Sequence, residues 1–539
     1  MRGRSCPPHW CGAPAACRTS SSAFDRAARR YRLALEYGEF DGVKRKEIHL
    51  RLGDALAARG RGHAAAQAYL AAASGALAAD QLELKRRAAE QLLRSGHFDE
   101  GMRVLNQVLA ALGMRLPTTP GQALLSLLMR RLWIRLRGMR FRERDRSELS
   151  AAEIVRVDTC WSVATVIGVV DTIRGADFQA RHLLLALASG ESMRVCRAFA
   201  VEIAYTSLGG AGARKRQQQL IGRAEALVAR LAQPEPRALL NLAKGTAAFF
   251  AGDWAEAHQL FESGEPLLRE CSGVTWELDT AHLYHVLALV YLGEIKEVSA
   301  RLPAILQEAR ERDDLTAETN LRTRTTYIVK LAEDNPDQAS LEVQQGMAGW
   351  AHPGFHAQHS WELYARTEID LYRGDGAMAW GRLCEHWKPL RRSMLLRIQA
   401  VRVESLYLRA RSAIAAWGDE PPEEVRRRLL KTAARDAERL QQEGAMWAAA
   451  LGALVEAGVD TMRDDPGAAV ARLAAAEASF RDLGMRLHAT VALRRRGQLL
   501  TGREGERLVQ EADTWMTAQS IRNPSRMAAM LAPGVFAAE

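Results

Sequence analysis

Two helical hairpins can be read from LLNLAKGTAAFFAGDWAEAHQLFESGEPLL (239–268) and WELDTAHLYHVLALVYLGEIKEVSARLPAILQEAR (276–310). Apolar residues recur every three or four positions in both segments, which is the period of an amphipathic helix. Each segment is interrupted by a glycine and an acidic residue, at Gly252-Asp253 and Gly293-Glu294. The glycine supplies the left-handed end of one helix, and the acidic residue favours the N-terminus of the next. We therefore predict an antiparallel helix pair in each segment.

The same pattern recurs along most of the 539 residues. Other bends are predicted at Gly60 to Gly62, Ser95-Gly96, Arg174-Gly175, Gly209 to Gly212, Asn335-Pro336, Gly374-Asp375, Gly418-Asp419 and Asp465-Pro466. From Gly252 onward the bends lie about 40 residues apart, which is longer than the ~34 residues of a tetratricopeptide unit. Small and aromatic residues still follow the tetratricopeptide order through Gly245, Phe249, Ala257 and Phe261. The predicted fold is an all-α superhelical array of antiparallel helix hairpins, tetratricopeptide-like with an irregular period.

Five parts are expected along the chain. They are 1–22 as a disordered tail or an imprecise start, 23–115 as N-terminal helical hairpins, 116–150 as a proline break and an Arg-rich amphipathic helix, 151–520 as the main helical-repeat array, and 521–539 as a C-terminal tail. A repeat array lets so long a chain avoid separate globular cores, because each unit buries its apolar face against its neighbours.

The composition limits which partners and which cellular location can be expected for this protein. The formal net charge is +10, but 65 arginines against nine lysines are typical of a GC-rich bacterial genome and do not by themselves indicate a nucleic-acid partner. We find no run of 18 apolar residues and no secretory signal, so we expect a cytoplasmic protein without a transmembrane segment. Four cysteines stand singly in apolar helical patterns, as in a reducing compartment. They are Cys160, Cys196, Cys271 and Cys384.

Three further cysteines lie near the start of the chain. Cys6, Cys11 and Cys17 cluster around His9, but their spacing lacks the C-x2-C pair of zinc sites. A disordered tail is therefore favoured over a metal site.

An unusual basic segment, ALLSLLMRRLWIRLRGMRFRERDR, follows the proline break at 123–146. It holds eight arginines and two acidic residues between Met129 and Arg146. An apolar stripe along a helix would contain Leu125, Met129, Leu132, Leu136 and Met139. We expect the arginine stems to cover apolar surface while their charged ends stay in water. Docking on an anionic membrane or on nucleic acid is the alternative. The interaction candidates are Arg130, Arg131, Arg135 and Arg137.

A histidine-rich segment, HPGFHAQH (352–359), has the look of a metal site. Its histidines at 352, 356 and 359 lack the further cysteine or histidine motif that a zinc site needs. We expect His356 or His359 to pack beside Trp361 and Tyr364 in a groove, and these four are the second set of interaction candidates.

Catalytic motifs are missing from the sequence. The nearest approach to a phosphate-binding loop, GGAGARK (209–215), lacks the Gly-Lys-Ser/Thr ending and follows a predicted helix. We find no kinase glycine-rich loop, no HRD or DFG motif, no GxSxG and no HExxH. The prediction is a protein with no catalytic residue, no cofactor and no metal site of its own.

Several segments resemble one family. They are ELKRRAAEQLLRSGHFDEGMRVL (83–105), FRERDRSELS (141–150), CWSVATVIGVVDTIRGADFQARHLLLALASGE (160–191), QHSWELYARTEIDLYRGDGAMAW (358–380) and IRNPSRMAAMLAPG (521–534). Together they are similar to the C-terminal tetratricopeptide-like region of large bacterial serine/threonine protein kinases. Those proteins combine a kinase domain, an AAA-type ATPase module and helical repeats. This chain has neither the kinase nor the ATPase part, so the resemblance carries over no catalytic or nucleotide-binding residue.

The expected function is a non-catalytic protein-interaction or sensor module in signal transduction. The resemblance implies a protein or peptide partner, such as a kinase or ATPase module. One alternative is part of an active serine/threonine kinase whose catalytic domains are encoded upstream. The other is a basic adaptor that docks on membrane or nucleic acid, although we expect neither surface to be the main partner.

Overall fold

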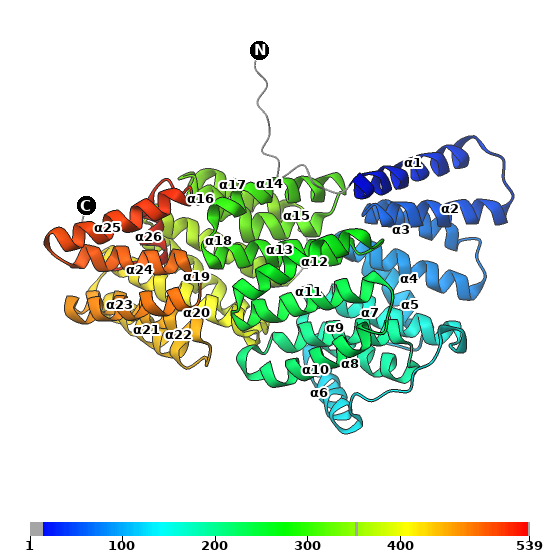
Figure 1. Cartoon of the computed structure of the whole chain (residues 1–539), viewed down its shortest axis with the longest axis horizontal. Helices are drawn as coiled ribbons and strands as arrows, with labels where there is room; N and C mark the ends of the chain where they lie inside the picture. The colour runs from blue at the N-terminus through cyan, green and yellow to red at the C-terminus, as the bar shows by residue number, and fades with distance from the viewer. Residues whose placement is uncertain (1–14, 351–353, 537–539) are drawn as a thin grey trace, which may run out of the picture.

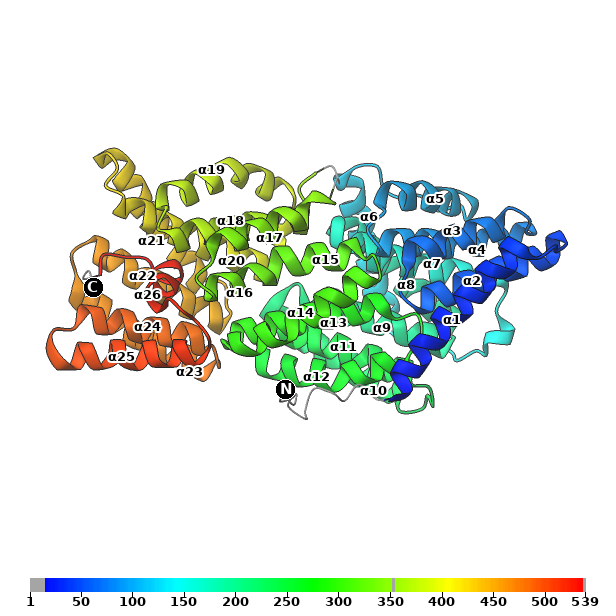
Figure 2. The same cartoon turned by 90° about the horizontal axis from the view of Figure 1, so that it is seen from above.

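The computed structural model describes residues 15–350 and 354–536. Throughout those ranges the chain forms helices and turns without a β-strand, which confirms the all-α prediction. Successive helices pack as antiparallel neighbours, and the hairpins follow one another along the long axis (Figure 1). The first hairpins lie at one end of the array, and α24 and α25 lie at the other (Figure 2).

The N-terminal hairpins form as predicted from their bends. Their helices are α1 (Ala15–Tyr37), α2 (Gly42–Ala58), α3 (Gly62–Ala73), α4 (Ala78–Arg94) and α5 (Phe98–Ala111). Helix α1 begins at Ala15, so the last residues of the range 1–22, for which a disordered tail was predicted, are helical. Cys6, His9 and Cys11 lie outside the described residues.

The proline break is followed by one helix and two hairpins. Their helices are α6 (Pro120–Arg137), α7 (Ala151–Val170), α8 (Thr172–Ser189), α9 (Ser192–Ser207) and α10 (Arg214–Val228). The predicted bend at Arg174-Gly175 is wrong, because the chain turns at Asp171, whose side chain accepts a hydrogen bond from the Arg174 backbone. Gly175 lies inside α8, where a Cβ would come within 2.3 Å of the Gly168 Cα. That glycine lets α7 and α8 approach closely.

The two hairpins of the 239–310 stretch are confirmed. Their helices are α11 (Pro234–Ala251), α12 (Trp254–Glu270), α13 (Thr275–Leu292) and α14 (Ile295–Glu311). Gly252 and Gly293 end α11 and α13 with φ of 87° and 84°, in the left-handed region that favours glycine.

The array then continues to the C-terminal end of the described residues. Its helices are α15 (Leu315–Leu321), α16 (Tyr327–Ala332), α17 (Pro336–Ala348), α18 (Ala357–Arg373), α19 (Gly376–Arg392), α20 (Gln399–Gly418), α21 (Glu423–Gln441), α22 (Met446–Met462), α23 (Pro466–Asp482), α24 (Arg486–Leu499), α25 (Gly502–Ala518) and α26 (Pro524–Leu531). A π-helical turn at Arg322–Thr326 joins α15 to α16. The predicted bends at Asn335-Pro336, Gly374-Asp375 and Asp465-Pro466 fall between helices as expected.

Hairpins far apart in sequence touch because the array coils back on itself. The turn after α11 contacts α22, where a Cβ on Gly252 would lie 2.6 Å from the Trp447 ring. Across another seam, the Gln399 backbone donates a 3.2 Å hydrogen bond to the Leu208 carbonyl. Further turn glycines of this kind are Gly60 against Arg312, Gly96 against Leu315, Gly210 against Gln399 and Gly293 against Leu487. The hairpins therefore stack in superhelical layers.

The predicted C-terminal tail at 521–539 is largely structured. Asn523 starts α26 by accepting a hydrogen bond from the Arg526 backbone, so Asn523-Pro524 begins a helix, whereas the preceding helix α25 ends earlier, at Ala518. Helix α26 packs against α18, α24 and α25. Its apolar side chains are buried, namely Met527, Ala528, Met530 and Leu531. No helix in the described part of the chain is long and apolar enough to span a membrane.

Candidate functional site

A pocket of about 270 Å³ lies between the layers of the array. Helices α7, α9, α11, α13, α15, α18 and α20, which are the first helices of successive hairpins, supply most of its walls. The hairpin arrangement directs one face of each of these helices inward. The pocket is therefore a product of the superhelix and not of any single repeat.

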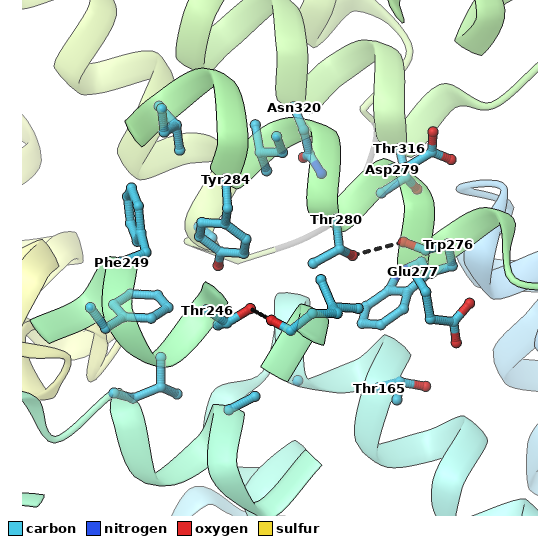
Figure 3. Close-up of a pocket in the computed structure, with 18 of the residues that line it drawn as sticks. Thr165, Thr246, Phe249, Trp276, Glu277, Asp279, Thr280, Tyr284, Thr316 and Asn320 are labelled. Carbon is cyan, nitrogen blue, oxygen red and sulfur yellow. Dashed lines mark hydrogen bonds between the residues drawn. The ribbon is translucent and has the colours of Figure 1, made fainter. Parts of the chain in front are cut away.

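The walls of the pocket are mainly apolar and aromatic. Phe249 of α11 and Tyr284 of α13 face each other with ring centroids 5.0 Å apart on one side (Figure 3). The hydroxyls of Thr246 and Thr280 each donate a 2.8 Å hydrogen bond to a carbonyl of their own helix. Because those hydroxyls are already bonded, they add little polarity to the walls. Burial raises the pKa of Tyr284 to about 12, so its phenol stays neutral.

The opposite side of the pocket carries a buried ion pair. Glu277 of α13 is 3 % exposed, and its Oε1 lies 3.4 Å from a guanidinium nitrogen of Arg94 in α4. Its Oε2 finds no hydrogen-bond partner among the described residues. Burial raises the pKa of Glu277, and the Arg94 charge opposes that rise. A ligand group that donates a hydrogen bond to Oε2 would satisfy a buried acceptor.

Two aspartates extend this polar side, which Figure 3 shows around Glu277, Asp279 and Thr316. Asp279 pairs with the guanidinium of Arg312. Burial, together with the nearby Asp279 carboxylate, raises the pKa of Asp314 to about 7. The Thr316 hydroxyl is buried and has no hydrogen-bond partner in the described part of the chain. Polar groups are thus concentrated at one end of an otherwise apolar pocket.

The other end of the pocket is closed by a second ion pair. The π-helical turn between α15 and α16 carries Arg324, which pairs with Glu404 of α20. The Arg324 guanidinium also lies 5.1 Å from the centre of the Tyr364 ring. The charges of Arg324 and Glu404 compensate each other. This end therefore defines the shape of the pocket and offers a ligand no unpaired charge.

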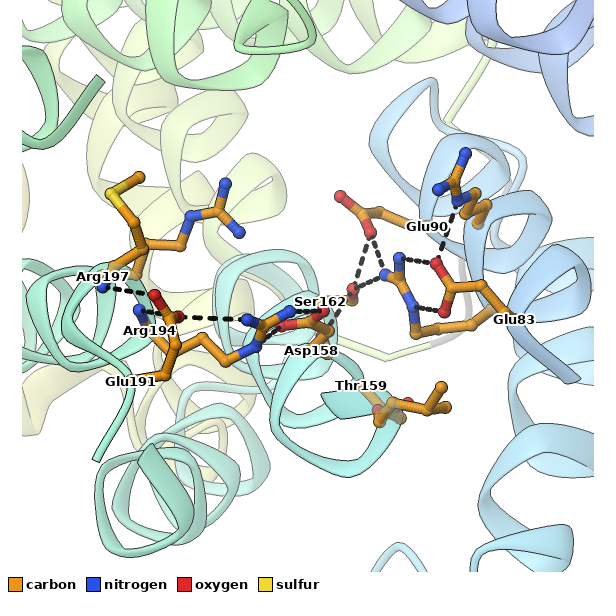
Figure 4. A network of polar contacts seen from close by, with 12 residues as sticks. Glu83, Glu90, Asp158, Thr159, Ser162, Glu191, Arg194 and Arg197 are labelled. Carbon is orange, nitrogen blue, oxygen red and sulfur yellow. Dashed lines mark hydrogen bonds and ion pairs between the residues drawn. The ribbon is translucent and has the colours of Figure 1, made fainter. Parts of the chain in front are cut away.

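A polar network joins α4 to α7, and Figure 4 labels Glu90 and Ser162 within it. Arg86 of α4 lies 2.6 Å from Glu90, and the Ser162 hydroxyl of α7 donates a 2.7 Å hydrogen bond to the same carboxylate. Glu90 in turn lies 2.8 Å from Arg94, which reaches Glu277. The charges of α4 and α13 are therefore linked in one continuous chain, to which the Ser162 hydroxyl of α7 adds a hydrogen bond. The Arg86 and Arg94 charges hold the pKa of Glu90 low, at about 2.

The second set of predicted residues lies at or near this pocket. Trp361 lines it, and Tyr364 accepts a 3.3 Å hydrogen bond from Arg411. His356 and His359 stand at the start of α18, where the His356 backbone donates a 3.2 Å hydrogen bond to the His359 ring. Their rings lie 5.6 Å apart between centroids. His352 lies outside the described residues. Across the described ranges, no three histidine, cysteine or acidic side chains gather as metal ligands.

The first set of predicted residues lies on α6, away from the pocket. Arg130 lies 3.4 Å from the buried Asp177, and Arg131 lies 2.5 Å from the buried Glu202. Arg137 donates to the Leu187 carbonyl at 3.2 Å. Only Arg135 of the four is exposed and makes no ion pair or hydrogen bond within the described part of the chain. Three of the four arginines thus fasten α6 to the body of the protein.

Most of the pocket was missed by the sequence interpretation. Glu277 and Asp279 stand within the apolar run of α13, and buried charges in such a run were the available signal. Arg94 gave no signal, because nothing local places it beside Glu277. No family model matches the chain, and no curated protein matches it.

Proposed function

We propose that this protein is a non-catalytic sensor module that binds a small, mainly apolar ligand in the pocket between its superhelical layers. The pocket itself carries the proposal, because its concave, aromatic walls and few polar groups are typical of small-molecule sites. No histidine, cysteine or lysine is among its described lining residues. Its acids near the polar end are Glu277, Asp279 and Asp314, which suit a hydrogen-bond donor on the ligand.

A ligand in this pocket would contact helices that are far apart in the chain. Thr165 of α7 and Glu404 of α20 both line the pocket. A bound molecule would therefore favour one relative placement of the layers, since ligands shift equilibria by differential affinity. In this proposal a partner protein binds preferentially to that arrangement of the layers. The sequence resemblance suggests a kinase or ATPase module as such a partner.

The test uses the apolar fluorophore N-phenyl-1-naphthylamine as the probe. We expect saturable binding with one site per chain of 539 residues. Ala204 is a half-buried lining residue of α9, and Ala204→Phe should weaken binding about tenfold or more by filling the pocket. Ala255→Phe, on the exposed side of α12, is the matched control and should bind as the wild type does. Equal probe binding by both variants would overturn the assignment of the pocket.

The alternative is an active kinase. Saturable ATP binding with phosphoryl transfer by the purified chain would replace the sensor proposal. We expect neither, because the sequence contains no recognisable nucleotide-binding motif.

A further inference from the structure

Helix α6 presents an uncovered apolar face to solvent. Six of the fifteen exposed large apolar side chains in the described ranges lie on this helix, each between 57 % and 71 % exposed. They are Leu125, Leu128, Met129, Leu132, Trp133 and Leu136. Their spacing of three and four residues places them along one face. We call this set the α6 ridge.

The remaining side of α6 is bound to the protein. Ala123 and Ile134 are buried, and Leu127 packs against the core formed by α8 and α9. Arg130 and Arg131 pair with buried carboxylates of α8 and α9. The helix is therefore held in place with its ridge outward. Figure 1 shows α6 at the edge of the array.

The surroundings of the ridge are basic. Helix α6 contains no acidic residue, and the segment that follows it adds further arginines. Four exposed guanidinium groups make no ion pair or hydrogen bond with any described residue. They belong to Arg135, Arg140, Arg142 and Arg146. The nearby Glu143 is occupied by Arg230, and Asp145 accepts hydrogen bonds from Ser147.

We propose that the α6 ridge and these four arginines dock the protein on an anionic membrane surface. Leucine and tryptophan on one side of a helix with arginine beside them are the features of helices that lie in the bilayer interface. The arginines complement anionic headgroups, and the tryptophan suits the boundary between headgroups and acyl chains. The ridge is a single convex helix. A bilayer can surround such a ridge, whereas a partner helix needs a groove.

The attachment is peripheral, because no described helix can span the bilayer. From the sequence we expected the arginine stems to lie across the apolar surface of this helix and to cover it. The structure instead leaves the stripe uncovered and assigns Met139 to the core, after the helix ends at Gly138. The proposed docking surface is also separate from the pocket.

The experiment is co-sedimentation of the full chain with vesicles of phosphatidylcholine alone or mixed with phosphatidylglycerol. We expect binding only to the anionic vesicles, with affinity falling as salt rises. Arg140→Gln/Arg142→Gln/Arg146→Gln should weaken that binding about a hundredfold, at ~1 kcal/mol for each arginine. Leu132→Gln/Leu136→Gln should abolish that binding, and both residues are exposed enough to leave the fold intact.

Matched controls come from α19, the turn that follows it and α22, all outside α6. Arg391, Arg392 and Arg397 are exposed and form no ion pair with a described residue, so their triple Gln variant should bind vesicles as the wild type does. Met378→Gln/Met446→Gln is the apolar control. Absence of wild-type binding, equal binding to both vesicle types, or equal loss in the controls would overturn the proposal. Dimer formation through the ridge without vesicle binding would also overturn it. The naphthylamine signal of the pocket should be unchanged in every α6 variant.

Discussion

Gly293 and Gly374 end their helices in the same backbone conformation but face different surroundings. Their φ angles are 84° and 86°. A Cβ on Gly293 would lie 2.6 Å from the Leu487 backbone nitrogen of the next layer. A Cβ on Gly374 would meet nothing within 4 Å. Gly374 is therefore required only for the backbone conformation of its turn, whereas Gly293 is also required for the close contact between layers.

Substituting alanine at the two positions separates these roles. Gly374→Ala should cost about 1–2 kcal/mol, the ordinary penalty of a left-handed L-residue. Gly293→Ala should cost about 1–3 kcal/mol more, because backbone atoms of two layers must move apart. Urea unfolding of both variants measures the difference. Equal losses of unfolding free energy would show that the layer contact adjusts freely.

Helix α26 is short, but it joins two longer helices through hydrogen bonds. The Tyr407 hydroxyl donates a 2.5 Å hydrogen bond to the Leu531 carbonyl, and the buried Arg411 donates to the Met530 carbonyl at 2.9 Å. Arg495 of α24 donates to the Ala532 carbonyl at 2.8 Å. Helices α20 and α24 are thus joined through the backbone of α26. Removing it would leave buried donors without acceptors.

Truncation tests this role of α26. A chain that ends after Arg522 should lose at least about 3 kcal/mol of unfolding free energy, because its buried methionines and leucine leave and their former neighbours become exposed. A chain that ends after Phe536 keeps every acceptor and the Phe536 ring beside Arg495, and it should unfold like the full chain. A synthetic peptide of residues 521–536, added in trans, should restore the melting temperature of the shorter chain. Indistinguishable melting of the two truncated chains would refute the role.

At the scale of the whole molecule, the layers are joined by the charges around Arg94. Arg94 keeps two partners, Glu90 at 2.8 Å within α4 and Glu277 at 3.4 Å across the seam. Glu277 has only Arg94 as an ion-pair partner within the described ranges. The two members of the pair are therefore not equivalent.

Removal of either partner should have unequal effects. Arg94→Met leaves a buried carboxylate without its cation and should cost about 3–5 kcal/mol at neutral pH. Glu277→Gln leaves Arg94 paired with Glu90 and should cost less than about 2 kcal/mol. Thermal unfolding of both variants, monitored by circular dichroism, gives the comparison.

The same pair predicts the pH dependence of stability. The folded-state pKa of Glu277 is raised, so this group's contribution is complete below the ordinary glutamate pKa and is lost as pH rises through the folded value. Without the Arg94 charge that pKa rises further. The stability deficit of Arg94→Met should therefore grow as pH rises above the ordinary glutamate pKa. A deficit that shrinks with rising pH would contradict this assignment of the charges.

Much of the helical order follows from local patterns in the sequence. Apolar residues at helical spacing and left-handed glycines such as Gly252 act within a few residues, so the sequence predicted most of the bends. The bend at Arg174-Gly175 failed because a glycine can also sit at a helix crossing. The range 521–539 was predicted as a tail, although an Asn-Pro pair such as Asn523-Pro524 can start a helix. Four of the five residues predicted for the apolar stripe lie along α6, but Met139 lies beyond the helix, and the favoured interpretation did not predict that the stripe is exposed.

The sequence by itself determined an all-helical array of hairpins, because helical periodicity and turn chemistry are local properties. Only the tertiary structure decided that the hairpins enclose a pocket and that they leave the α6 ridge exposed to solvent. The pocket exists because superhelical coiling arranges the first helices of successive hairpins around one space, where Arg94 of α4 meets Glu277 of α13. The α6 ridge is exposed because no later hairpin in the described part of the chain returns to cover it. Both outcomes depend on the summed small rotations between hairpins, which no local pattern of residues encodes.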